Sequence, residues 1–174
     1  DGEFPTELKN VFDAYEVQSN PWGLPADTRG DWAKGLDVPL IRSAGDMARV
    51  DWLYYVGSAE SFDQNGQRIA RAFVEILREA GVSFGILGAQ EPTTGECVRR
   101  AGNEMLFQQL ATTLVESFKG LGVKQIVTCD PHAFNSLRNE YPASGGLWEV
   151  VHHTQLIDRL LAEKRLEAQP THER

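Results

Sequence analysis

Three side chains that could bind a metal or take part in catalysis follow a short apolar segment late in the chain. Residues 125–128 (QIVT) have the apolar pair Ile126–Val127 at their centre, and Cys129, Asp130 and His132 come just after them. Thiolate, carboxylate and imidazole groups are all zinc ligands, and Cys97 would supply a second thiolate. Their spacing follows no known zinc pattern, so the alternative is two small buried thiols and a helix-capping Asp130. Zinc binding by these four residues is therefore one of two hypotheses.

Two other chemistries find no support in the loop that follows residues 52–56. This loop contains only Gly57, so it lacks the GxGxxG motif of dinucleotide sites. Ser58 does not stand in a GxSxG nucleophile elbow. We interpret Ser58 to Glu60 as a turn that leads into a helix cap. No pair of carboxylates stands out for general acid–base catalysis.

Two pairs of basic residues need either a functional or a structural explanation. The His152–His153 pair follows a predicted strand, where it could supply ligands or acid–base groups. The Arg99–Arg100 pair lies near the start of a predicted helix, where the helix dipole disfavours cations. We therefore expect an acidic partner for these arginines, either Glu91 or Glu96.

From residue 51 onward, apolar runs alternate with segments of helical periodicity. The pattern predicts strands at 52–56, 82–87, 123–128 and 148–151, and helices at 63–80, 96–120, 131–139 and 154–166. Such alternation predicts an α/β fold: a parallel four-stranded sheet flanked by helices in Rossmann-like βα repeats. In these sheets ligands bind at the carboxyl ends of the strands, which is where the residues considered above would lie.

The first third of the chain lacks this alternation. We interpret residues 1–50 as an N-terminal helical extension that wraps the domain, with helices at 6–18 (Thr6 as N-cap) and 27–34. Residues 51–168 would form the α/β domain, and residues 169–174 a frayed tail.

Composition and charge exclude several classes of protein. The chain has 174 residues and a net charge of -8, which argues against a nucleic-acid-binding face. No apolar run approaches the roughly 18–20 residues of a membrane span, so we expect no direct membrane insertion. The N-terminus is no signal peptide, and two cysteines form no disulfide framework. These features favour a cytoplasmic protein, and a place at the inner face of a membrane complex fits them equally well.

Several longer stretches resemble a known family. They are SNPWGLP (19–25), VDWLYYVGSAESFD (50–63), RIARAFVEILREAGVSFGILG (68–88), RRAGNEMLFQQLA (99–111), GVKQIVT (122–128), PHAFNSLRNEYP (131–142) and WEVVHHTQLI (148–157). With them the chain resembles the first cysteine-rich (CCG) domain of heterodisulfide-reductase-like iron–sulfur oxidoreductases. The resemblance implies a domain of a longer protein, with 4Fe-4S clusters in neighbouring domains. It also implies a packing or capping role for the His152–His153 pair, which the family carries whatever its substrate.

The chain departs from the family at the residues that matter most for cofactor binding. In the family, cysteines on the strand-end loops hold an iron–sulfur cluster or zinc, and the matching positions are Ser58, Thr93, Asp130 and Ala133. An iron–sulfur cluster needs about four thiolates, and none of these residues supplies one. The resemblance therefore implies a domain that has lost its cluster ligands and holds no cofactor of its own. We expect Thr93, Asp130 and the loops around them to collapse inward or to hold ordered water.

The expected function follows from this departure. We expect a structural or docking domain of an iron–sulfur electron-transfer oxidoreductase, not catalytic by itself, whose partners are other domains or subunits of the complex. One alternative is a metal-binding redox domain that uses Cys97, Cys129 and His132. The other is an interaction module unrelated to electron transfer.

Overall fold

Four parallel strands form the centre of the molecule. The computed structural model describes residues 4–168, so the expected frayed tail at 169–174 lies outside the described residues. The strands are β1 (Trp52–Tyr55), β2 (Phe84–Gly85), β3 (Gln125–Thr128) and β4 (Glu149–His152), in the order β2-β1-β3-β4. All three pairings are parallel. The predicted α/β fold with a parallel four-stranded sheet is confirmed.

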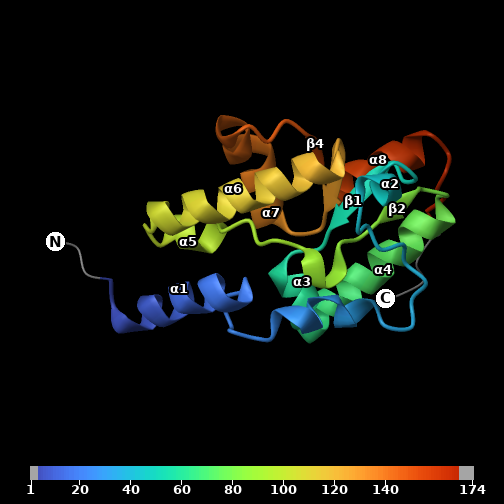
Figure 1. Ribbon diagram of the computed structural model, residues 1–174. Coiled ribbons are helices and arrows are strands. Elements are labelled where there is room, and N and C mark those ends of the chain that lie inside the picture. The colour runs from blue at the N-terminus through green and yellow to red at the C-terminus, as the bar shows by residue number, and fades with distance from the viewer. Residues whose placement is uncertain (1–3, 169–174) are drawn as a thin grey trace.

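Helices surround this sheet (Figure 1). The α-helices are α1 (Thr6–Gln18), α2 (Ala44–Met47), α3 (Ser58–Phe62), α4 (Gln64–Glu79), α5 (Glu96–Arg100), α6 (Glu104–Leu121), α7 (Pro131–Asn135) and α8 (His153–Ala162). Three short 3₁₀ helices are η1 (Ala26–Ala33), η2 (Gly88–Gln90) and η4 (Tyr141–Ser144), and η3 (Ser136–Glu140) is a π-helical turn. Among residues 4–168, no helix is both long and apolar enough to cross a bilayer.

The strands bury side chains on both faces of the sheet, as their continuous apolar runs predict. In β1, Leu53 and Tyr55 join a cluster with α1, α2 and α6, whereas Tyr54 joins a second cluster with η1, α4 and α8. We call these sides the α6 face and the α4 face. Cys129 continues β3 and lies in the cluster on the α4 face.

The N-terminal residues contribute to both faces and to one edge. Phe12 and Tyr15 of α1 are buried on the α6 face, and Trp32 of η1 is buried on the α4 face. Leu40 then pairs in parallel with Ile86, just beyond β2, and so covers that edge strand. Residues of the extension therefore pack on both faces and on one edge of the sheet, and the domain boundary at residue 50 stays a prediction.

Several details differ from the sequence-based expectation. The single helix predicted at 96–120 is two helices, because Gly102 adopts a positive φ of 88° and Asn103 caps α6 through Leu106 N–H. The Ser58–Glu60 turn begins a short helix instead, and the helix predicted at 27–34 is the 3₁₀ helix η1, which spans Ala26–Ala33. The expected N-cap Thr6 is the first residue of α1, preceded by Pro5.

Candidate functional site

The carboxyl ends of the strands form one edge of the sheet, here called the rim. α3 follows β1, the loop 88–95 follows β2, α7 follows β3 and α8 follows β4. η1, from the N-terminal extension, contacts both α3 and η2 at this edge. In Figure 1 this blue segment runs beside α3. The rim is therefore built from four strand-end loops and one segment that lies far away in sequence.

A buried ion pair lies at the rim. The guanidinium of Arg29 and the carboxylate of Glu91 are 3.3 Å apart, and each side chain is only 1% exposed. Glu91 also accepts hydrogen bonds from the backbone N–H groups of Val56 and Gly57, each at 2.8 Å. Burial raises the pKa of Glu91, whereas Arg29 and the two backbone donors oppose this rise. The charges of Arg29 and Glu91 therefore stabilise each other, since a buried charge without a partner is strongly unfavourable.

Two positions that the resemblance assigns to cluster ligands make hydrogen bonds within the protein. The Oγ of Ser58 accepts a hydrogen bond from Arg29 at 3.1 Å. The Oγ1 of Thr93 accepts one from the backbone N–H of Gly95 at 3.3 Å, and Thr93 is buried. The burial of Thr93 agrees with the inward collapse expected for its loop.

The other two positions belong to α7. Asp130 is the N-cap of this helix, and its Oδ1 accepts hydrogen bonds from His132 N–H at 2.8 Å and Ala133 N–H at 3.2 Å. Ala133 is buried in the cluster on the α6 face. Gly57 has a φ of 85°, and a β carbon there would lie 2.8 Å from the Oδ2 of Asp130. Asp130 therefore has the capping role considered as its structural alternative, and it packs closely on Gly57.

An iron–sulfur cluster does not fit these four positions. They offer two hydroxyl groups, one carboxylate and one methyl group, whereas such a cluster is held by thiolates. The polar groups at three of them, Ser58, Thr93 and Asp130, also make hydrogen bonds to other parts of the chain. A cluster bound in the manner of the family would have to displace these contacts and would find no sulfur ligand.

A carboxyl oxygen without a hydrogen-bond partner lies near Asp130. Glu60 is 6% exposed, and its Oε2 has no hydrogen-bond partner. This oxygen lies 3.4 Å from the point that a Gly57 β carbon would occupy. Burial, together with the negative charges of Asp130 and Glu91, raises the pKa of Glu60 to about 7. A large fraction of Glu60 is therefore protonated near neutral pH.

The two cysteines lie in different surroundings. Cys129 is buried on the α4 face, where the hydroxyl of Tyr54 donates a hydrogen bond to its sulfur at 3.6 Å. Burial raises the pKa of the Cys129 thiol to about 12. Cys97 is exposed and interacts with Tyr15, which packs on the α6 face. Among the described residues, no group of three or more His, Cys, Asp or Glu side chains is placed to hold a metal ion. The structure thus does not assemble Cys97, Cys129, Asp130 and His132 into a site.

The Arg99–Arg100 pair has acidic partners, as expected. Arg100 contacts Glu96 at 3.0 Å, and both arginines contact Glu140, at 2.7 Å and 2.5 Å. Of the two predicted partners, Glu96 is confirmed and Glu91 is wrong, because Glu91 is already paired with Arg29. The sequence does not indicate Glu140 as a partner, because it belongs to η3, which is far from Arg99 and Arg100 in sequence.

The two histidines at the junction of β4 and α8 contact neighbouring elements of the fold. The imidazole of His152 lies 2.8 Å from Thr154 Oγ1 and 3.2 Å from the carbonyl oxygen of Cys129. The ring of His153 packs on Phe73, with 5.7 Å between ring centroids, and burial lowers the pKa of His153. These contacts support the packing and capping role that the resemblance implies.

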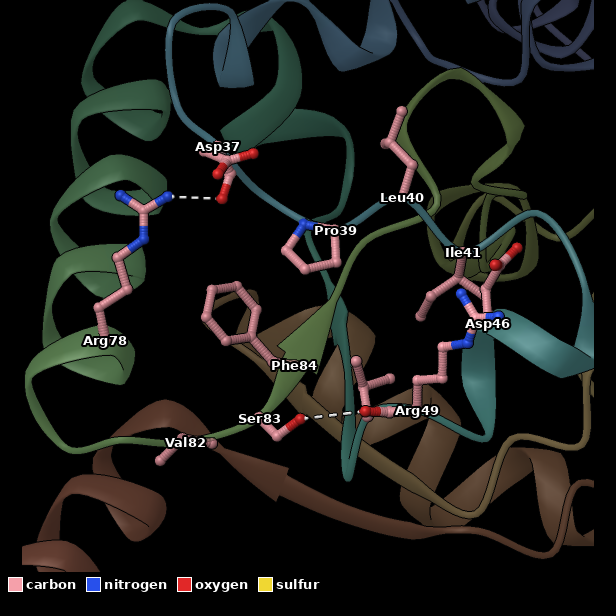
Figure 2. Close-up of a pocket in the computed structure, with 11 residues that line it drawn as sticks. Asp37, Pro39, Leu40, Ile41, Asp46, Arg49, Arg78, Val82, Ser83 and Phe84 are labelled. Carbon is pink, nitrogen blue, oxygen red and sulfur yellow. Dashed lines mark hydrogen bonds between the residues drawn. The ribbon is translucent and has the colours of Figure 1, made fainter.

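A pocket of 560 Å³ lies at the opposite end of the sheet, beside the start of β2. Figure 2 shows Arg78 reaching the backbone oxygen of Asp37, and Ser83 donating to the backbone oxygen of Arg49. Residues 81–85 read GxSxG, but a nucleophile elbow places its serine after a strand and before a helix. Ser83 instead precedes β2, so this run is no elbow.

Arg29, Glu60 and Glu91 are buried charged or titratable groups of the rim that the sequence does not indicate as site residues. Glu60 and Glu91 stand in predicted strand-end loops, which is a signal for their location but not for their burial. Arg29 has no such signal, because it lies in the extension and reaches the rim only through the tertiary fold.

Comparison with known proteins gives relatives that are much longer than this chain. The probable iron–sulfur-binding oxidoreductase FadF of Bacillus subtilis is 39% identical over 99% of this chain and 25% of its own length. The EtfAB:quinone oxidoreductase of Syntrophomonas wolfei is 40% identical over 95% of this chain and 23% of its own length. The chain thus spans about a quarter of these relatives.

A more distant relative belongs to the heterodisulfide reductases. It is a subunit of the dihydromethanophenazine:CoB–CoM heterodisulfide reductase of Methanosarcina barkeri, 27% identical over 67% of this chain and 30% of its own length. No family model matches the chain, and no solved structure matches it. The homologues are therefore FadF-like iron–sulfur oxidoreductases and a heterodisulfide reductase subunit, as the resemblance predicts.

Proposed function

Because this chain is homologous to one part of FadF-like iron–sulfur oxidoreductases and of a heterodisulfide reductase subunit, we propose that it is a domain of such an electron-transfer protein. In this proposal the domain holds no cluster. It supports and docks the neighbouring domains or subunits that carry the 4Fe-4S clusters. A cytoplasmic location at the inner face of a membrane complex belongs to the same proposal.

The main support for this proposal is that the side chains at the four ligand positions all contact other groups of the protein. Ser58 binds Arg29, Thr93 binds Gly95, and Asp130 caps α7. Ala133 is part of the core. The side chains of the rim contact one another and the backbone, which is how a scaffold would retain its shape without a cofactor. The redox chemistry then belongs to other parts of the complex.

Metal analysis tests the absence of a cluster. The chain is purified without oxygen, its visible spectrum is recorded, and its iron, sulfide and zinc are quantified. We expect less than stoichiometric iron and zinc and no sulfide-to-iron charge-transfer absorbance. A variant with cysteine at all four positions (S58C, T93C, D130C, A133C), prepared in parallel, shows whether the procedure can load a cluster. Stoichiometric iron and sulfide in the unmodified chain would overturn the proposal, and stoichiometric zinc would favour the metal-binding alternative.

The electron-transfer setting has a separate test. The coding sequence around this chain should encode ferredoxin-like cysteine runs before residue 1 and a second cysteine-rich domain after residue 174. A reading frame that encodes this chain without either feature would favour an interaction module unrelated to electron transfer.

A further inference from the structure

η1, residues Ala26–Ala33, lies across the rim and is anchored by two buried side chains. Arg29 is 1% exposed and Trp32 is 3% exposed. Because a 3₁₀ helix has three residues per turn, side chains three positions apart lie on the same side. Both anchors therefore enter the protein from one side of η1, and each one reaches a different part of the rim.

The first anchor joins three segments through one guanidinium group. Arg29 contacts Glu91 at 3.3 Å, the backbone oxygen of Ser19 at 2.6 Å and the hydroxyl of Ser58 at 3.1 Å. The guanidinium also lies over the ring of Phe62, 5.5 Å from its centroid. The loop after β2, the end of α1 and helix α3 are thus held together by a residue of η1.

The second anchor covers the side of the rim that contains the buried thiol. The rings of Trp32 and Tyr54 meet edge to face, with 6.1 Å between centroids, and Tyr54 hydrogen-bonds the sulfur of Cys129. The backbone oxygen of Trp32 also accepts a hydrogen bond from Arg71 of α4 at 2.5 Å. η1 therefore covers Tyr54, which in turn contacts Cys129.

The backbone of η1 contributes little stability of its own. A 3₁₀ helix has poorer hydrogen-bond geometry than an α-helix, and no side chain caps its N-terminus at Pro25. It also lies outside the sheet, since the extension pairs with β2 only later, at Leu40 and Ile86. Segments outside the hydrogen-bonded core of a protein can open locally before the whole protein unfolds. η1 packs on η2, α3 and α4, and Arg29 and Trp32 are its two buried side chains, so the loss of an anchor should favour its opening.

We propose that η1 is a latch: the Arg29–Glu91 ion pair holds it over the rim, and its release opens the rim while the sheet stays folded. Opening exposes the carboxylate of Glu91 and the thiol of Cys129 to solvent. This inference does not depend on the proposed electron-transfer function. It concerns only how access to the strand-end loops is controlled.

Labelling of Cys129 by a thiol reagent tests the latch. A Cys97→Ser chain leaves Cys129 as its single thiol, and in the closed state this thiol is buried and unreactive. In this chain Arg29→Ala should raise the labelling rate by about tenfold or more, because it removes the anchor from a locally opening segment. Arg78→Ala is the matched control, since Arg78 also binds a backbone oxygen, that of Asp37, but does so away from the rim. It should leave the rate unchanged.

The dependence of labelling on urea separates local opening from global unfolding. Opening of η1 exposes little surface, so the labelling rate should depend only weakly on urea at low concentrations. This measurement needs only the Cys97→Ser chain and stays informative if Arg29→Ala does not fold. A labelling rate that follows global unfolding, with the same steep urea dependence, would overturn the latch. So would an Arg29→Ala chain that folds and labels no faster than its parent.

Discussion

At the scale of single residues, the rim balances several carboxyl groups against one buried cation. Arg29 neutralises Glu91, and Asp130 is satisfied by the backbone donors of α7. The Oε2 of Glu60 lacks a hydrogen-bond partner. A buried carboxylate next to other negative charges is costly, so Glu60 responds by holding a proton.

The pH dependence of stability should report this proton. The pKa of Glu60 rises from 4.5 to about 7 on folding. Between these values the folded state binds more protons than the unfolded state, so stability falls as pH rises from about 4.5 to about 7. Glu60→Gln removes this loss and should gain up to about 3 kcal/mol over the parent above pH 7, with little difference near pH 4.5. Urea unfolding of both chains across this pH range measures the difference in their free energies of unfolding.

A matched substitution controls for the change of charge. Glu116→Gln replaces an exposed glutamate of α6, and its stability should run parallel to that of the parent at every pH. A parallel curve for Glu60→Gln as well would mean that Glu60 does not titrate abnormally in the folded protein.

The residue scale also shows how far the sequence alone can lead. It places Asp130 at a strand end and offers a helix cap as its alternative role, because the cap depends on local spacing that can be read from the chain. It does not reveal Arg29, because the contact with Glu91 joins residues that only the tertiary fold brings together. The sequence also does not show whether Cys129 can join a metal site, because its burial on one face depends on how the sheet packs. Among the described residues, no group of three metal-binding side chains forms.

At the scale of elements, the alternation of strands and helices is predictable because it depends on local periodicity. The main error is the helix at 96–120, which the periodicity of its apolar residues predicts as one helix although the chain breaks it in two. Gly102 and Asn103 are a helix end and a helix cap side by side, and this local signal prevails over the periodicity. Met105, near the start of α6, is 76% exposed, so the apolar residues of the predicted helix do not all face the core.

The edge of β2 gives a prediction at this scale. A β carbon on Gly85 would lie 2.9 Å from Ile41 Cγ1 and 3.0 Å from the backbone oxygen of Pro39. Gly85→Ala should therefore push the 39–41 segment away from β2 and destabilise the fold by about 1–3 kcal/mol, as overpacking does elsewhere. Thermal or urea unfolding measures the loss.

Gly120 provides the matched control for that substitution. It lies in α6, and apart from its chain neighbours and the backbone of its own helix no atom comes within 4 Å of the point that a β carbon would occupy there. Gly120→Ala should be neutral or stabilise by up to about 1 kcal/mol, since alanine favours a helix. An equal effect of the two substitutions would mean that the 39–41 segment does not pack against Gly85 as described.

At the scale of the whole molecule, the extension and the sheet form one packed unit. Without residues 1–50, the α6 face would lose Phe12 and Tyr15, and the α4 face would lose Trp32. The rim would also lose Arg29 and leave Glu91 as an unpaired buried charge. The α/β pattern from residue 51 predicts the sheet, but the sequence does not show that both of its faces depend on the extension.

Truncation tests this dependence. A chain of residues 51–168 should lack a cooperative unfolding transition, because it exposes apolar surface on both faces of the sheet and an uncompensated carboxylate at the rim. Residues 1–168 serve as the control and should unfold cooperatively, since they keep every described contact of the extension. Adding residues 1–50 as a separate peptide should restore a transition to the shorter chain. Far-ultraviolet circular dichroism during urea unfolding measures all three samples. A chain of residues 51–168 that unfolds cooperatively at the midpoint of the control would show that the extension lies on the domain without stabilising it.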